Sequence, residues 1–125
     1  MAIKIITVGP DFADERGVIK AVLDNAKHSI KSVLYIKSKK GTIRGKHFHK
    51  KDCHYVYCLS GSFVYTESVS PNSKREQITL YPGDLVFTKP NHWHSMEYLE
   101  DSEMLAMATE PRIQHKYEKD TFRSD

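Results

Sequence analysis

Cysteine is scarce in this chain of 125 residues, which contains only Cys53 and Cys58. Cys58 lies in the predicted strand at residues 54–59 and Cys53 directly precedes it in the same extended segment, so their side chains point to opposite faces and cannot bridge each other without bending the strand. The sequence therefore excludes a disulfide framework and favours buried free thiols in a reducing cytoplasm. A role as a soft ligand or nucleophile for Cys53, beside His54, is the weaker alternative.

Long apolar runs are also missing. No segment approaches the roughly 20 apolar residues that a membrane span needs, and residues 1–4 lack the apolar stretch of a secretory signal. The net charge is only +3, aromatics are not interleaved with basic residues, and no recognition-helix pattern is present. We expect neither a membrane nor nucleic acid as a partner. We predict one cytoplasmic domain over residues 1–125, with residues 110–125 as a C-terminal arm.

Helical periodicity is nearly absent. It is limited to a turn or two at residues 22–28 and a polar tail after Pro111 that packs as a short helix or as an arm, with Tyr117 and Phe122 as anchors. The apolar residues instead alternate with period two, and turns separate the segments. The predicted strands are residues 3–8, 17–23, 30–37, 45–49, 54–59, 62–67, 77–80, 84–88, 92–98 and 104–109. So many short strands predict an all-β fold, a small jelly-roll barrel or double-stranded β-helix.

Histidine is present in an informative pattern. His47 and His49 are two residues apart and share one face of a strand, His54 begins the next strand, and His94 follows the turn at residues 89–91. His92 has the parity of His94 and is predicted to line the same pocket or its mouth. Four inward imidazoles would cost several kcal/mol if nothing satisfied them. We therefore predict a metal site, a proton-transfer site, or both.

Basic residues are concentrated in residues 37–51, which hold Lys37, Lys39, Lys40, Arg44, Lys46, Lys50 and Lys51. Such a run is either a solvated face or an anion-attracting rim beside the histidines, suited to a phosphorylated small molecule. In the second case Arg44 would pair bidentately with a diphosphate and Lys46 would add charge nearby. Trp93 either stacks on a sugar or base or packs as an ordinary aromatic.

The spacing of these residues resembles the cupin superfamily. The first cupin motif maps onto Gly41, His47, His49, His54 and Gly61, and the second onto Pro82-Gly83-Asp84 and Pro90-Asn91-His92-Trp93-His94. Two positions depart from the pattern. His54 replaces the usual glutamate, and Asn91 replaces a turn glycine, which is tolerable because asparagine accepts left-handed dihedral angles.

Residues 29–36, 44–51 and 58–62 are similar to the nucleotide-sugar 3,4-ketoisomerases, and beyond them to the 3,5-epimerases of deoxysugar pathways. These enzymes rearrange dTDP-4-keto-6-deoxyhexoses for surface polysaccharides, and the ketoisomerases are generally thought to need no metal. The resemblance implies a catalytic centre of Tyr35, His47 and His49. With histidine pKa values near neutrality, we expect His49 as the base, His47 as donor or orienter, and Tyr35 as hydrogen-bond donor to the oxyanion.

Two other functions stay open. A metal-dependent cupin would use the four nitrogens of His47, His49, His54 and His94 to bind zinc, iron, nickel or copper, and would catalyse oxygenation, lysis or isomerisation. A cupin that binds sugar without catalysis is the third possibility. In each case we predict a homodimer, because residues 3–8 form a candidate exposed edge strand that needs covering.

Overall fold

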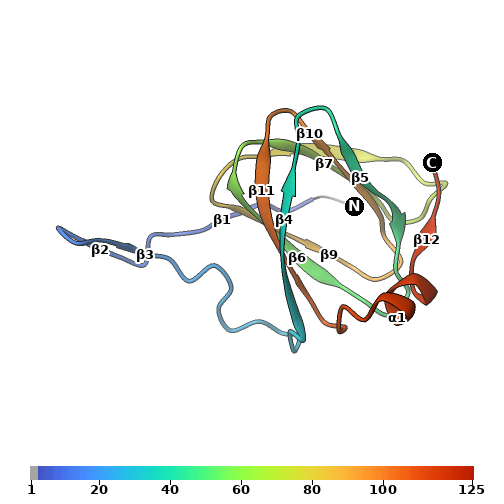
Figure 1. Cartoon of the computed structure of the whole chain (residues 1–125), viewed down its shortest axis with the longest axis horizontal. Coiled ribbons are helices and arrows are strands. Elements are labelled where there is room, and N and C mark those ends of the chain that lie inside the picture. The colour runs from blue at the N-terminus through green and yellow to red at the C-terminus, as the bar shows by residue number, and fades with distance from the viewer. Residues whose placement is uncertain (1–2) are drawn as a thin grey trace.

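Two five-stranded antiparallel sheets face each other and enclose the core (Figure 1). The structure is a computed structural model that describes residues 3–125. One sheet has the order β1-β9-β6-β11-β4 and the other β12-β5-β10-β7-β8. From β4 to β11 the chain changes sheet at every connection except β7–β8, which is the jelly-roll arrangement and confirms the predicted fold class. The strands are β1 (Ile6–Thr7), β2 (Phe12–Asp14), β3 (Gly17–Ile19), β4 (Ser32–Ser38), β5 (Ile43–Phe48), β6 (His54–Ser60), β7 (Phe63–Ser68), β8 (Glu76–Leu80), β9 (Asp84–Thr88), β10 (Trp93–Tyr98), β11 (Ser102–Ala108) and β12 (Phe122–Arg123).

The N-terminal region differs most from the sequence prediction. The strand predicted at residues 17–23 ends at Ile19 and pairs with Phe12–Asp14 in a hairpin that projects from the barrel (Figure 1). The prediction of a helix at residues 22–28 is wrong. That segment is irregular, with Asn25 at a φ of 52°, and its Val22 and Leu23 pack against the outer face of a sheet. Tertiary packing has overridden a weak helical pattern.

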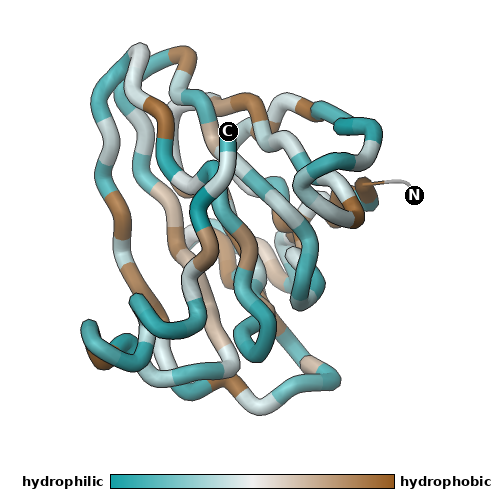
Figure 2. The backbone as a smooth tube through the Cα atoms, turned by 90° about the vertical axis from the view of Figure 1, so that its right-hand side faces the viewer, coloured by the Kyte–Doolittle hydropathy of each residue, from teal (hydrophilic) through white to brown (hydrophobic). Residues whose placement is uncertain are grey.

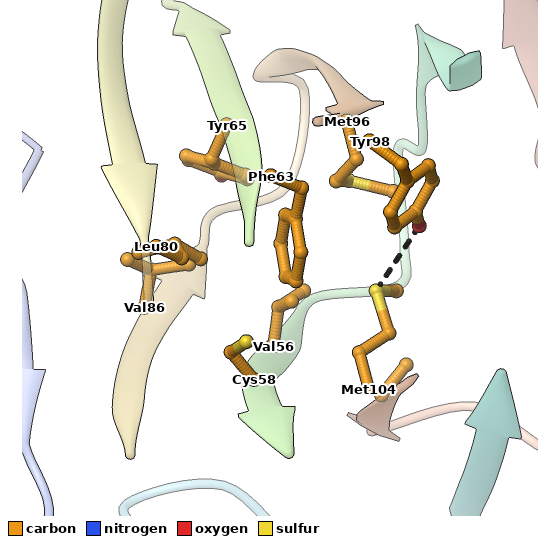
Figure 3. Close-up of a cluster of buried hydrophobic side chains, with 10 residues drawn as sticks. Val56, Cys58, Phe63, Tyr65, Leu80, Val86, Met96, Tyr98 and Met104 are labelled. Atoms are coloured by element: carbon orange, nitrogen blue, oxygen red, sulfur yellow. Dashed lines mark hydrogen bonds between the residues drawn. The ribbon is translucent and has the colours of Figure 1, made fainter. Parts of the chain in front are cut away.

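Strand alternation gives the barrel a hydrophobic end and a polar end. On β6 the same face carries His54, Val56 and Cys58, and on β10 it carries His94, Met96 and Tyr98. The residues away from the histidines form the main core, with Val56, Cys58, Phe63, Tyr65, Leu80, Val86, Met96, Tyr98 and Met104 (Figure 3). The histidine positions at the ends of the same strands are thereby held by the best-packed part of the molecule.

The C-terminal segment closes one side of the barrel. The short helix α1 (Gln114–Lys119) is followed by β12, which pairs with β5 and places Phe122 on Phe48 with ring centroids 5.2 Å apart. Figure 2 looks at this side, with the C-terminal end in front. The predicted tail thus forms both a short helix and a strand. Cys53 and Cys58 are buried and free, as predicted. Within residues 3–125, no helix is long and apolar enough to span a membrane.

Candidate active site

A pocket of about 750 Å³ opens at the histidine end of the barrel, a size that suits a small-molecule ligand. Its floor is apolar and is shared with the core through Val56, Met96 and Met104. Its wall holds the four predicted histidines, His47, His49, His54 and His94. Within residues 3–125, six cationic side chains line it: Arg44, Lys51, Arg112, Lys116, Lys119 and Arg123. Three carboxylates, Asp52, Glu110 and Asp120, also line it, so the lining keeps an excess of positive charge that suits an anionic ligand.

The imidazole rings converge. Ring centroids lie 4.6 Å apart for His47 and His49, 4.7 Å for His47 and His94, and 5.0 Å for His54 and His94. Candidate ligand atoms of His47, His49 and His94 all lie within 4.8 Å of one another, and those of His49, His54 and Asp52 form a second such set. The histidines predicted from sequence therefore meet in one cavity, and Asp52 joins them.

A bulge in β5 sets the position of His47. Gly45 and Lys46 have φ values of 91° and 56°, and the register of β5 with β10 shifts at this point. A side chain at Gly45 would place its Cβ 2.8 Å from the carbonyl oxygen of His94, so only glycine fits there. The bulge also turns Lys46 away from the pocket, and its Nζ lies 3.9 Å from a carboxylate oxygen of Asp125. The expectation that Lys46 lines the substrate site is wrong for this reason.

Three of the pocket histidines are each held by a hydrogen bond from their own Nδ1 atom. The Nδ1–H of His49 donates to the carbonyl oxygen of Asp120 (2.9 Å), that of His94 to the carbonyl oxygen of His92 (3.0 Å), and that of His54 to the carboxylate of Asp52 (3.2 Å). A carbonyl oxygen can only accept, so it fixes the tautomer of a neutral ring. In His49 and His94 this leaves the Nε2 lone pair for a proton or a metal.

Asp120 is a functional residue that the sequence did not reveal. Its carboxylate accepts hydrogen bonds from the backbone N–H groups of Lys50, Lys51 and Asp52 at 3.0–3.2 Å. The carboxylate of Asp52 in turn accepts a hydrogen bond from His54. The C-terminal segment therefore orients two histidines, His49 directly and His54 through the loop at residues 50–52. Asp120 and the residues it contacts are about 70 residues apart in the sequence, so no local pattern predicts the contact.

Burial lowers the pKa values of His47, His49 and His94. It brings the pKa of His47 to about 3, with a further contribution from nearby His49. Burial also lowers the pKa of His49 and, more strongly, that of His94. The expectation of pKa values near neutrality is therefore wrong for these three rings, which are neutral at pH 7. Neutral imidazoles accept a proton or coordinate a metal, but do not serve as imidazolium acids.

Tyr35 lies outside the pocket, contrary to expectation. On β4 the inward side chains are Leu34 and Ile36, which line the cavity, and strand alternation turns Tyr35 outward. Its side chain is 55% exposed, and its hydroxyl donates a hydrogen bond to the carboxylate of Glu103. A catalytic role for Tyr35 beside His47 and His49 does not fit this position.

His92 and Trp93 are also outside the pocket. His92 precedes β10, so strand alternation does not carry it to the face of His94, and its Nδ1 instead lies 2.6 Å from a carboxylate oxygen of Glu67. Trp93 has the opposite parity to His94 and is 2% exposed. Its indole N–H donates to the carbonyl oxygen of Ser124 at 2.8 Å, and it packs as a structural aromatic. The substrate-binding roles expected for both residues are therefore not supported.

Arg44 lines the pocket, and its role in substrate binding stays a prediction. Its Nε donates to the hydroxyl of Ser38 at 2.7 Å. The sequence had suggested the cationic rim of residues 37–51, but it did not point to the cations that α1 and its flanking residues add. The signal that was available is the density of basic and aromatic residues after Pro111.

Comparisons with known proteins agree with this geometry. The model of the family described as "FdtA: WxcM-like, C-terminal" matches residues 1–124. The chain belongs to this family. The resemblance found in the sequence is confirmed by the match and by the similar solved structures. No curated protein sequence matches the chain significantly.

Solved structures of this fold include sugar-nucleotide enzymes. QdtA, a sugar 3,4-ketoisomerase from Thermoanaerobacterium thermosaccharolyticum in complex with TDP, is 27% identical, with a TM-score of 0.79 over 98% of this chain and 88% of QdtA. The WlaRB TDP-quinovose 3,4-ketoisomerase from Campylobacter jejuni is 24% identical, with a TM-score of 0.81 over 98% and 92%. The dTDP-6-deoxy-D-glucose-3,5-epimerase RmlC from Legionella pneumophila, 16% identical, has a TM-score of 0.79 over 97% and 71%. The last two similarities concern the fold alone.

Proposed function

We propose that this protein is an isomerase of a nucleotide-linked 4-keto-6-deoxyhexose that moves the carbonyl from C4 to C3. Family membership and the similarity to QdtA support the enzyme class and the substrate class. The observation that carries the chemistry is the hydrogen bond from His49 Nδ1 to the carbonyl oxygen of Asp120. It leaves the Nε2 lone pair of a neutral ring in a ligand-sized pocket, as a general base requires.

The reaction needs a proton transfer from C3, one to C4, and one from O3 to O4. His49 Nε2 takes the proton from C3, the C3–H electrons form a C3=C4 double bond, and the carbonyl oxygen at C4 becomes an oxyanion. The O3 hydroxyl proton then passes to the O4 oxyanion as the C3 carbonyl forms, and the imidazolium of His49 returns its proton to C4, directly or through His47. His47, with its ring 4.6 Å from that of His49, is placed to relay a proton between the two carbons. Burial keeps both rings neutral before the first transfer.

The cationic mouth is suited to the diphosphate of the substrate. Arg44 and Lys51 come from the barrel, while Arg112, Lys116 and Lys119 come from the C-terminal segment. Arg123 forms an ion pair with the carboxylate of Glu118 through two hydrogen bonds of 2.9 and 3.1 Å, which offsets its charge, whereas Arg44 donates only to the neutral oxygens of Ser38 and Lys37. Guanidinium groups match phosphate oxygens bidentately, so Arg44 and Arg112 are the proposed direct contacts.

Isotope incorporation tests the proposal. The untagged protein is incubated with dTDP-4-keto-6-deoxyglucose in deuterated water and the products are followed by NMR. A 3-keto sugar with deuterium at C4 supports the 3,4-isomerase. Deuterium at C3 and C5 of a 4-keto sugar would indicate a 3,5-epimerase instead. Binding without exchange would indicate a sugar-binding cupin and would refute the enzymatic proposal.

A metal-dependent cupin is the second candidate, because the ring orientation also suits coordination. Nδ1 donation from His49, His54 and His94 to oxygen acceptors is the usual support of metal-binding histidines. His47, His49 and His94 would hold the ion, with His54 as a further nitrogen donor, and such donors suit zinc, iron, nickel or copper. A bound ion would act as a Lewis acid on a carbonyl oxygen. Metal analysis of the untagged protein is the direct test.

We further propose a homodimer. The β2–β3 hairpin projects from the barrel with Phe12, Val18 and Ile19 exposed by 52–64% (Figure 1). The outer face of β4 presents Val33 and Tyr35, which are 61% and 55% exposed. Apolar surface of this kind is usually covered by a partner. Light scattering should give twice the chain mass at micromolar concentration, and a monomer would refute the proposal.

The cytoplasmic location and the role in polysaccharide synthesis stay predictions from the sequence.

A further inference from the structure

The C-terminal helix brings a tyrosine into the pocket. Within residues 3–125, Tyr117 is the only tyrosine that lines the cavity. Its ring centroid lies 5.3 Å from that of His49 and 6.4 Å from that of His47, edge-on to both. On β4, where the sequence predicted the catalytic tyrosine, Leu34 lines the cavity and the neighbouring Tyr35 does not.

The proposed reaction needs a neutral donor near the two histidines. An oxyanion develops at C4, and a fixed hydrogen-bond donor lowers its energy most in a water-poor site. The other hydroxyl among the lining residues belongs to Ser32, and it already donates to the carbonyl oxygen of Glu110 at 2.8 Å. The buried imidazoles that donate Nδ1–H are likewise committed to Asp120, His92 and Asp52.

We propose that Tyr117 is a catalytic residue whose hydroxyl donates a hydrogen bond to the enediolate oxygen, the role predicted from sequence for Tyr35. This inference rests on the proposed isomerase function. Burial raises the pKa of Tyr117, which keeps the phenol protonated and able to donate at neutral pH.

The surroundings hold the ring in place. The guanidinium of Arg112 lies over one face of Tyr117, 3.7 Å from its centroid. The hydroxyl of Thr121 donates to the carbonyl oxygen of Tyr117 at 2.6 Å and anchors its backbone. Asp120, three residues on, ties the segment to the loop at residues 50–52. A donor supported in this way is pre-organised for the transition state.

Three phenylalanine variants test the inference. Tyr117→Phe keeps the ring under Arg112 and removes only the hydroxyl. Tyr35→Phe tests the rival tyrosine, and Tyr81→Phe, at a 59% exposed turn residue, is the matched control. We expect kcat to fall about 100-fold in Tyr117→Phe, as for loss of an oxyanion donor, with KM within about threefold of wild type. The other two variants should keep wild-type kcat and KM.

Binding of TDP, measured by calorimetry, reports independently on whether the site is folded. Tyr117→Phe should bind TDP as the wild type does. A kcat loss below tenfold, an equal loss in Tyr35→Phe, or loss of TDP binding together with activity would each overturn the role of Tyr117. A wild-type protein that exchanges no deuterium into the keto sugar would instead refute the proposed function itself.

Discussion

Replacing Asp120 with alanine should destabilise the barrel and disorder the active site together. The change removes a carboxylate that accepts backbone N–H groups from Lys50, Lys51 and Asp52. A hydrogen bond to a charged group contributes about 1.5–3 kcal/mol, but exposed N–H groups regain water, so the sum is well below three full bonds. We expect a loss of about 2–3 kcal/mol in the free energy of unfolding. For a domain of this size that lowers Tm by about 10 °C.

Urea unfolding at pH 7 measures this loss as a lower midpoint at constant m. Asp101→Ala is the matched control, because Asp101 accepts one backbone N–H, from Lys40, far from the histidines. It should cost about 1 kcal/mol or less and leave activity unchanged. Asp120→Asn, which keeps an acceptor oxygen, should fall between the two. Equal stabilities for Asp120→Ala and Asp101→Ala, or a fully active Asp120→Ala, would refute the positioning role.

Three further outcomes follow from the histidine cluster. His49→Asn should lower kcat by about 10²–10⁴-fold, as for loss of a general base, with Tm within a few degrees of wild type; retained turnover would rule out the base role. His54→Gln should be nearly silent in a metal-free isomerase, whereas loss of a stoichiometric metal with activity would support the metal-dependent alternative. Because burial lowers the pKa of His47, His49 and His94 below the unfolded value of 6.5, their contribution to stability is present above pH 6.5 and is lost as pH falls through their lowered folded pKa values, which for His47 is about 3. Urea midpoints should therefore decrease from pH 7 to pH 5, and constant or rising midpoints would contradict neutral buried rings.

Alternation in the sequence was enough to predict the barrel and the convergence of its histidines. His54 shares a strand face with Val56 because they are two residues apart, and this also makes the pocket floor continuous with the core. The same rule, applied to residues 30–37, places Leu34 inward and Tyr35 outward. The expectation for Tyr35 came from the family resemblance and overrode that pattern.

The sequence predicted that the C-terminal segment packs on the barrel, but not that Asp120 and Tyr117 reach the pocket, and the reason is physical. Asp120 reaches Lys50–Asp52 and His49 across about 70 residues, and Tyr117 reaches the same ring only because β12 pairs with β5. A six-residue helix leaves little periodic signal. The bulge at Gly45 and Lys46, which turns Lys46 away from the pocket, likewise depends on the pairing of β5 with β10.

The proposed isomerisation depends most on proton abstraction from C3 of the sugar by the neutral ring of His49. The rate of loss of the C3 proton signal of dTDP-4-keto-6-deoxyglucose in deuterated water, compared between wild type and His49→Asn, measures that step directly. We predict rapid loss with the wild type and a rate at least 100-fold lower with the variant. Equal rates for the two proteins, or no loss of the C3 proton signal with the wild type, would contradict the role of His49 as the base.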